Sequence, residues 1–284
     1  MEDNDIIRFN VATTLLGILN HNDEDATEDI LARYLLENMS RLDNLSIYTI
    51  ANDCYTSRST VQRFIKQIGY GSYTELKAAC RNYFDEHAHT FASYTDRTQF
   101  ADYLAEELSA MARDVNAVAR QQDISWLARR MREVRTILFL TAEDSSSAVR
   151  VLQQAMLGTG RLMRLMTSST QSMEPLKLLG RKDLLIVCSA TGNFALTIAD
   201  YIRATDAQRV LVTNNHTASF EGDYTRIFYL GERHPLQSRN IQSNRSVYTY
   251  YAVQYFLDLL FHEYFLLEGG TPARQRTAAA NKTI

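Results

Sequence analysis

Residues 57–66 carry hydroxyl, amide and cationic side chains on the spacing of one helix face. Apolar residues at i, i+3, i+4 and i+7 interleave with them, so the opposite face of the same helix must lie on a core. Glutamine and arginine can bond base edges in the major groove, and lysine, serine and threonine can hold phosphates. The stretch therefore predicts a short helix that offers DNA-contacting groups to solvent. With Ser57 as the helix cap, these groups are Ser57, Arg58, Ser59, Thr60, Gln62, Arg63 and Lys66.

The chain around this helix supports the same interpretation. An apolar stripe ends near Cys54 and leaves a turn of three or four residues, so the two helices must cross steeply, as in a helix-turn-helix. Residues 54–84 hold five cations and one carboxylate, whereas residues 1–53 hold three arginines and eleven carboxylates. Any amphipathic helix has a solvated polar face. The DNA-binding interpretation therefore depends on the turn, the stripe and the basic patch together.

A second set of polar residues follows a buried-strand pattern at 183–188. Ser189, Thr191, Gly192 and Asn193 lie between this strand and a predicted helix that carries Ala195, Ile198, Ala199 and Ile202 on one face. Hydroxyl groups beside the free N–H groups of a helix N-terminus can bind an anion. Many turns of parallel sheets carry such caps without binding anything, so the turn by itself is a weak signal.

The strand pattern at 136–140 also leads into polar residues. Ser145 and Ser146 could donate hydrogen bonds to the same ligand, but Glu143 and Asp144 precede them. Two inward carboxylates would repel a phosphate. If the acids point to solvent, the serines can still bind an anion. If the acids point inward, an amino sugar could use them.

Other candidate residues favour structural roles. A loop histidine such as His216 is more often an ordinary polar residue than a ligand. His262 and Glu263 point apart because neighbouring helix positions do, so they form no evident acid–base pair. The three cysteines, Cys54, Cys80 and Cys188, have no metal-ligand spacing. We therefore expect no metal site and no cofactor.

The order of the elements indicates two domains. We expect an all-α helix-turn-helix domain at 1–85, a linker at 86–98, an α/β domain at 99–268 and a flexible tail at 269–284. In the α/β part, five short apolar runs at 136–140, 162–166, 183–188, 209–213 and 226–230 read as strands. Helical stretches separate the first four, which predicts a parallel sheet with helices on both faces.

The N-terminal part resembles one known family. The stretch from "LARYLLENMS" to "KAACRNYF", with its "TVxRF" core and "GYxSYxELK" ending, resembles the N-terminal domain of RpiR-family bacterial transcriptional regulators over residues 27–84. It departs from helix-turn-helix turns at Tyr55, where glycine is common. A left-handed backbone there would cost about 1 kcal/mol.

The resemblance implies a C-terminal sugar isomerase (SIS) domain, a flavodoxin-like αβα sandwich that senses a phosphosugar in most members. Ser189, Thr191 and Gly192 match the S-x-S-G-x-T phosphate loop of that family, whereas Phe194 replaces its last hydroxyl residue. The family's glycine-rich turn after the first strand is missing here.

Together these features predict a bacterial transcriptional regulator of carbohydrate metabolism rather than an enzyme. Its expected partners are a double-stranded DNA operator, a phosphosugar or amino-sugar effector, and a second copy in a homodimer or homotetramer. The net charge of −3 excludes an overall polycation, and the longest apolar run is interrupted by charges. We expect a cytoplasmic protein outside the membrane. The alternatives are an SIS-like domain that only dimerises, and a sugar-phosphate isomerase with an appended helical domain.

Overall fold

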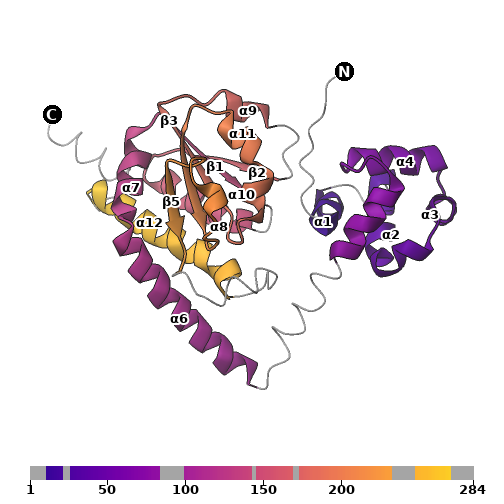
Figure 1. Cartoon of the computed structure of the whole chain (residues 1–284), viewed down its shortest axis with the longest axis horizontal. Helices are drawn as coiled ribbons and strands as arrows, with labels where there is room; N and C mark the ends of the chain where they lie inside the picture. The colour runs from indigo at the N-terminus through magenta and orange to yellow at the C-terminus, as the bar shows by residue number, and fades with distance from the viewer. Residues whose placement is uncertain are drawn as a thin grey trace. The chain divides into compact units, whose positions relative to one another are not determined.

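The computed structural model describes residues 11–21, 26–83, 99–142, 145–168, 173–231 and 247–269. The chain divides into two compact units, Met1–Ser93 and Tyr94–Ile284 (Figure 1). The predicted linker at 86–98 lies outside the described residues, as does the predicted tail at 269–284 except for Gly269. None of the helices in the described ranges is both long and apolar enough to cross a membrane.

The first unit is helical in its described residues. Its elements are α1 (Val11–His21), α2 (Thr27–Glu37), the 3-10 helix η1 (Met39–Asn44), α3 (Ile47–Asp53), α4 (Arg58–Gln67) and a helix over residues 73–83. Serine caps start two of them, because Ser46 Oγ accepts from Thr49 N and Ser57 Oγ accepts from Thr60 N. The last helix is also capped by a serine, since Ser72 Oγ accepts from Glu75 N.

The core of the first unit collects one face of each helix. Leu15 of α1, Leu35 of α2, Phe64 of α4 and Leu76 of the last helix are all buried in one apolar cluster. Tyr73 closes this core at its edge, where its hydroxyl lies 2.9 Å from Leu45 O as a donor. The predicted all-α bundle is confirmed for this unit.

The second unit is built on a parallel sheet. Its strands are β1 (Thr136–Thr141), β2 (Arg164–Thr167), β3 (Asp183–Cys188), β4 (Gln208–Thr213) and β5 (Arg226–Tyr229). They pair in the order β2-β1-β3-β4-β5, and every pairing is parallel. This is the flavodoxin-like order of a doubly wound sheet. The predicted fold class, an all-α unit followed by an αβα sandwich, is confirmed.

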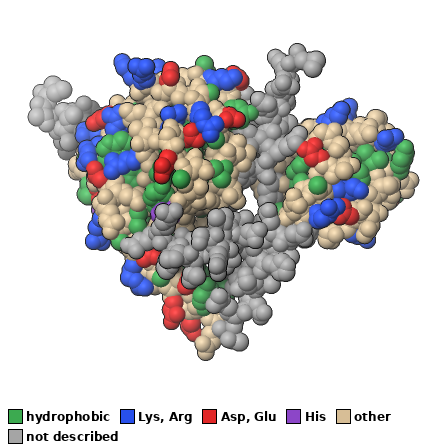
Figure 2. Space-filling model, viewed as in Figure 1, with side chains coloured by type: hydrophobic (Ala, Val, Ile, Leu, Met, Phe, Trp, Pro, Cys, Tyr) green, Lys and Arg blue, Asp and Glu red, His purple; other side chains and the backbone are tan. Residues whose placement is uncertain are grey.

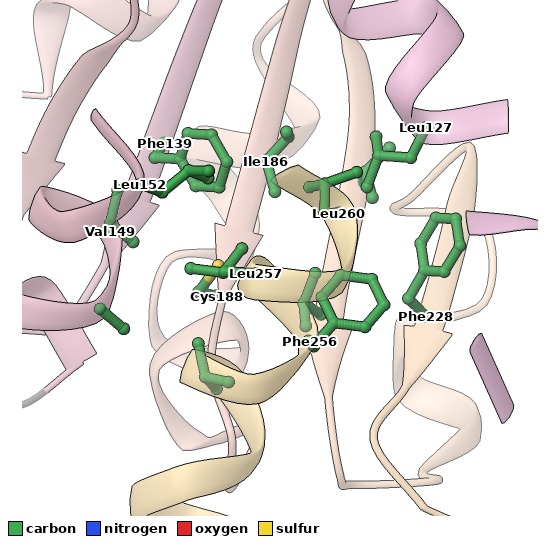
Figure 3. Packing of buried hydrophobic residues seen from close by; sticks show 14 of the residues in the cluster. Leu127, Phe139, Val149, Leu152, Ile186, Cys188, Phe228, Phe256, Leu257 and Leu260 are labelled. Carbon is green, nitrogen blue, oxygen red and sulfur yellow. The ribbon is translucent and has the colours of Figure 1, made fainter. Parts of the chain in front are cut away.

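Helices cover both faces of the sheet. They are α6 (Phe100–Gln121), α7 (Ile124–Glu133), α8 (Ser146–Gly158), α9 (Glu174–Lys177), α10 (Asn193–Thr197), α11 (Ala199–Arg203) and α12 (Val253–Leu267). On one face α12 packs against α7 and α8, while on the other α11 packs against α9. Figure 3 shows the first face, where Phe139 and Ile186 of the strands share one apolar cluster with Leu152 of α8 and Leu260 of α12. Strands β1 and β3 are nearly continuous apolar runs because they are covered on both sides.

The structure corrects one predicted strand in this unit and shows a turn in its last helix that was not predicted. The second strand begins at Arg164 rather than at 162, and Leu162 is 75% exposed outside the sheet. The final helix begins with a π-helical turn, η4 (Tyr248–Ala252), before the α-helical part of α12. Neither change alters the order of the elements.

An ion pair between a buried carboxylate and an exposed arginine lies at the start of the sheet. The Asp183 side chain is fully buried at the first position of β3 and accepts two hydrogen bonds from Arg135, the shorter of 2.7 Å. It also accepts from Gly180 N at 2.9 Å. These donors lower the pKa of Asp183 to about 2, with the Arg135 bond as the main cause. The carboxylate therefore stays charged where strands β1 and β3 begin.

Candidate DNA-binding surface and ligand-binding loops

The turn between α3 and α4 is held by backbone hydrogen bonds. Thr56 N donates to Ala51 O at 2.8 Å and Tyr55 N donates to Asn52 O at 3.1 Å, which is the bonding pattern of a Schellman motif. Tyr55 has a φ of 49°, so the left-handed backbone suspected from the sequence is present. Its side chain is 98% exposed and gains no packing in return.

Replacing Tyr55 with glycine should stabilise the first unit. Glycine adopts a left-handed backbone without the steric penalty, so we expect a gain of about 1 kcal/mol in the free energy of unfolding. Urea denaturation of the full chain, followed by hydrogen exchange in residues 47–68, measures it. Tyr55→Ala is the matched control and should show no comparable gain. Equal stability of the wild type and Tyr55→Gly would show that the left-handed backbone at Tyr55 costs no stability.

The two faces of α4 are separated as the sequence predicts. Val61, Phe64 and Ile65 are at most 2% exposed, and Ile68 beyond the helix is also buried. The side chains on the other face lie in solvent except for Thr60, which is half-buried. The exposed members of the predicted DNA-contacting set are Ser57, Arg58, Ser59, Gln62, Arg63 and Lys66. Figure 2 shows basic side chains on the surface over α4.

Hydrogen bonds order the start of this surface. Ser57 Oγ lies 2.7 Å from Ser59 Oγ and 2.9 Å from Thr60 Oγ1. Arg58 Nη1 donates to the hydroxyl of Tyr48 on α3 at 2.9 Å. Tyr48 was not predicted from the sequence, although the apolar stripe of α3 leaves its position on the outer face. The first turn of α4 is therefore organised before any partner binds.

The basic patch over residues 54–84 carries less unpaired charge than its five cations suggest. Arg81 forms a two-bond ion pair with Asp43, with its shorter bond at 2.7 Å, so one of the five cations is neutralised. No acidic partner within the described residues pairs with Arg63 or Lys66. The unpaired charge is thus concentrated on α4.

The predicted ligand-binding loops follow adjacent strands of the sheet. Strand β1 pairs with β3 so that Thr141 lies beside Cys188, and Thr141 Oγ1 donates to Cys188 O at 2.9 Å. From these ends the chain runs to opposite sides, because α8 leads from β1 to β2 whereas α10 and α11 lead from β3 to β4. Such a switch point is where open α/β sheets bind ligands. The sheet therefore brings together two loops that lie far apart in the sequence.

The loop after β3 is tightly packed. Ser189 is buried, and its hydroxyl accepts from Ala195 N at 3.3 Å, so this oxygen caps α10. Gly192 has a φ of 82°, and a Cβ there would meet Asn215 at 2.8 Å and Phe220 at 2.9 Å. Thr191 is half-exposed and Asn193 is exposed. The loop thus has no room for a side chain at position 192, while Thr191 and Asn193 present their side chains outward.

The helix after this loop is shorter than predicted. The expected single helix with Ala195, Ile198 and Ile202 on one face is interrupted at Ile198, where ψ is 8°, giving α10 and α11 of five residues each. All three residues are buried nonetheless. Phe194 is also buried, so the position where the family pattern has a hydroxyl fills the core instead. A helix of little more than one turn contributes a small dipole to anion binding.

The loop after β1 is described only in part. Ser145 forms the N-cap of α8, its N donates to Ala142 O at 3.2 Å, and Ser146 is buried. Glu143 and Asp144, whose direction decides between repulsion and binding of an anion, lie outside the described residues. Both serines follow the end of β1 at the switch point.

Residues at the end of β4 join the same region and were not found from the sequence. Asn215 Nδ2 donates to Thr191 O at 2.9 Å, and Asn214 N donates to Ala190 O at 2.8 Å. Asn214 Oδ1 is buried and has no hydrogen-bond partner in the described part of the chain. The tandem asparagines directly after a buried strand were the available signal. They supply amide groups next to the predicted ligand loop.

A comparison with protein families matches residues 14–87 to the helix-turn-helix domain of the rpiR family. The chain carries an RpiR-family helix-turn-helix domain. The matched region begins before residue 27, where the sequence resemblance began, so α1 belongs to the domain. The burial of Leu15 against the other helices explains why.

Several solved structures are similar to the chain. The NanR protein of Vibrio vulnificus complexed with ManNAc-6P is 15% identical, covers 97% of this chain and 99% of its own, and has a TM-score of 0.45. The sugar isomerase domain of an RpiR transcription factor from Sphaerobacter thermophilus is 13% identical over 63% of this chain and 97% of its own, with a TM-score of 0.46. A putative sugar-phosphate isomerase from Listeria monocytogenes is 14% identical over 65% and 97%, with a TM-score of 0.47. These likenesses concern the fold alone. No curated protein matches the chain.

Other polar residues outside the RpiR-type domain have structural partners. Glu263 accepts a hydrogen bond from Ser125 of α7, while its neighbour His262 is exposed. His216 is stacked on Tyr229 with ring centres 4.0 Å apart, and its Nε2 lies 3.0 Å from Gly231 O. These contacts agree with the ordinary role expected for His216, and Glu263 bonds to Ser125 rather than to its neighbour His262.

All three cysteines are buried, so their thiols stay uncharged. Burial raises the pKa of Cys54 to about 11 and that of Cys80 and Cys188 to about 12. The thiolate is the nucleophilic and metal-binding form, and these pKa values disfavour it at neutral pH. The cysteines therefore act as packing residues.

Proposed function

We propose that this protein is a transcriptional regulator whose α4 helix enters the major groove of a double-stranded operator. One observation carries the proposal. Val61 and Phe64 lock one face of α4 into the core, while Gln62 and Arg63 remain exposed on the other. A helix fixed in this way can offer only its polar face to a partner, and that face consists of base- and phosphate-binding groups.

The chemistry of each side chain suggests its contact. Gln62 and Arg63 carry the amide and guanidinium groups that pair with purine edges, and we assign them to bases. Lys66 and Ser59 suit phosphate oxygens, which fix the register of the helix on the duplex. Helix-turn-helix proteins bind two half-sites as dimers, so we include a second copy of the chain in the complex.

We further propose that a sugar phosphate or a related sugar derivative controls DNA binding from the second unit. The switch point between β1 and β3 supports this site, with Ser145 and Ser146 on one side and Thr191 and Asn193 on the other. The Oδ1 of Asn214, which has no hydrogen-bond partner among the described residues, is an acceptor that suits a sugar hydroxyl group. A ligand acts on DNA binding if it binds the DNA-competent and DNA-free states with different affinities.

The competing proposal is that the second unit serves only to dimerise the chain. The short α10 and the buried Phe194 favour it, because both weaken the anion site that the family pattern would provide. In that case the second unit would pair two copies of the chain without binding a ligand.

Selection from a randomised duplex library by the full-length protein tests the regulator proposal. We expect one duplex to be enriched. A panel of phosphosugars and amino sugars, including ManNAc-6P, is then added to the protein and to its complex with that duplex. A bound effector at 100 times its dissociation constant should add about 2.7 kcal/mol to the stability of the second unit.

The outcomes of this experiment separate the alternatives. The same effector should also change the affinity of the protein for the duplex. Asn215→Asp should weaken binding of the effector without unfolding the protein. Enrichment of a duplex with no response to any sugar would support the dimerisation-only proposal. Failure to enrich any duplex would reject the regulator.

A further inference from the structure

Tyr48 is an exposed aromatic residue that contacts the first residue of α4. It lies on α3 and is 64% exposed, so the core of the unit does not need its ring. Its hydroxyl accepts from Arg58 Nη1 at 2.9 Å, and the guanidinium carbon of Arg58 lies 5.1 Å from the centre of its ring. A hydrogen bond and a cation–π contact thus join two side chains across the helix-turn-helix turn.

These two contacts restrict the Arg58 side chain. A free arginine on a surface samples many rotamers and loses that freedom when it binds, at a cost of about 0.5–1.5 kcal/mol. Tyr48 removes part of that freedom before binding. Nη1 shares one contact with Tyr48, and the Nε and Nη2 edge of the guanidinium has no hydrogen-bond partner in the described residues.

We propose that Tyr48 is a positioning residue that holds the Arg58 guanidinium ready to bind a guanine in the major groove. The inference rests on the proposed function, in which α4 enters that groove. The N-terminal residues of a recognition helix are those that reach base edges, and Arg58 is the first residue of α4. The open edge of its guanidinium presents two parallel donors, which match guanine O6 and N7.

A base is the better partner for this arrangement than a phosphate. A phosphate can be bound by a lysine as a point charge, so its binding needs no guanidinium of fixed orientation. The two acceptors of a guanine, O6 and N7, lie in one plane. A guanidinium that is already held in a fixed orientation therefore gains most in affinity when it binds a guanine. Tyr48 therefore contributes to sequence preference more than to general affinity for DNA.

Equilibrium binding of full-length variants to two duplexes tests this inference. One duplex is that enriched by the wild type from a randomised library, and the other is a scrambled duplex of the same composition. Tyr48→Phe should weaken binding to the enriched duplex about threefold to tenfold, in line with the cost of ordering one side chain. Binding to the scrambled duplex should not change. Tyr55→Phe removes a hydroxyl from the other exposed tyrosine of this region and is the matched control.

A double-mutant cycle with Arg58→Ala separates positioning from a general effect on the fold. In the Arg58→Ala background, Tyr48→Phe should have no further effect on binding. A second library selection with Tyr48→Phe should lose preference for one guanine in each half-site. Wild-type affinity in Tyr48→Phe, or the same loss with and without Arg58, would overturn the positioning role while leaving the regulator intact. If the wild type enriches no duplex, the proposed function fails and takes this inference with it.

Discussion

Replacing Arg63 and Lys66 with alanine is expected to abolish most specific DNA binding while leaving the fold intact. Both side chains are exposed on α4 and have no ion-pair partner among the described residues, so their removal creates no cavity and no buried charge. Loss of a base contact costs about 1–3 kcal/mol, which is about 5- to 150-fold in affinity. Loss of a phosphate contact weakens binding to all duplexes alike.

Salt dependence distinguishes the two residues. If Lys66 neutralises a phosphate, Lys66→Ala should reduce the slope of log K against log salt by about 0.9. Arg63→Ala should mainly reduce the preference for the enriched duplex over a scrambled one. Titrations at several salt concentrations measure both effects. Arg120→Ala removes an exposed cation from α6 and is the charge-matched control. Unchanged affinity and slope in both α4 variants would reject α4 as the contact helix.

Phe64→Ala should destabilise the fold of the first unit, although Phe64 lies next to Arg63 in the sequence. Its side chain is 2% exposed in the cluster that joins α4 to the other helices of the first unit. Removing a buried phenylalanine costs about 3–5 kcal/mol, because transfer and cavity terms add. A domain of this size has little more stability to lose. We therefore expect the first unit to open at low denaturant concentration and DNA binding to fall with it.

Hydrogen exchange of the full chain measures this effect region by region. Amides in residues 58–83 should lose protection in Phe64→Ala, whereas those of strands β1 and β3 should keep theirs. Gln67→Ala, an exposed change on the same helix, serves as the control. Wild-type protection in residues 58–83 would show that α4 is not anchored through this side chain.

The sequence predicted elements well where burial repeats with a regular period. The stripe with Val61 and Phe64 placed α4 to within a residue or two, and the strand at 183–188 matches β3. Predictions were wrong where a local signal competes with packing. Leu162 extends an apolar run but lies outside β2, and Ile198 continues a helical stripe while the helix breaks there. Periodicity reports which residues are buried, and it does not report where backbone hydrogen bonding stops.

The candidate sites divide in a similar way. The exposed polar face of α4 was predictable, because a single helix fixes which side chains share a face, and its contacts with DNA stay a prediction. Tyr48 was missed because its link to Arg58 crosses the turn. Asn214 and Asn215 were missed because their place beside the β3 loop depends on β4 pairing with β3.

The sequence by itself determined the helix-turn-helix unit, the alternation of strands and helices, and the polar face of α4. These properties follow from short-range spacing, since each helix or strand repeats its burial pattern within a few residues. Only the tertiary structure decided the strand order, the meeting of the β1 and β3 loops, the Arg81–Asp43 pair and the contact between Tyr48 and Arg58. Those depend on contacts between residues distant in the chain, which form when buried faces pack together and which no local spacing encodes.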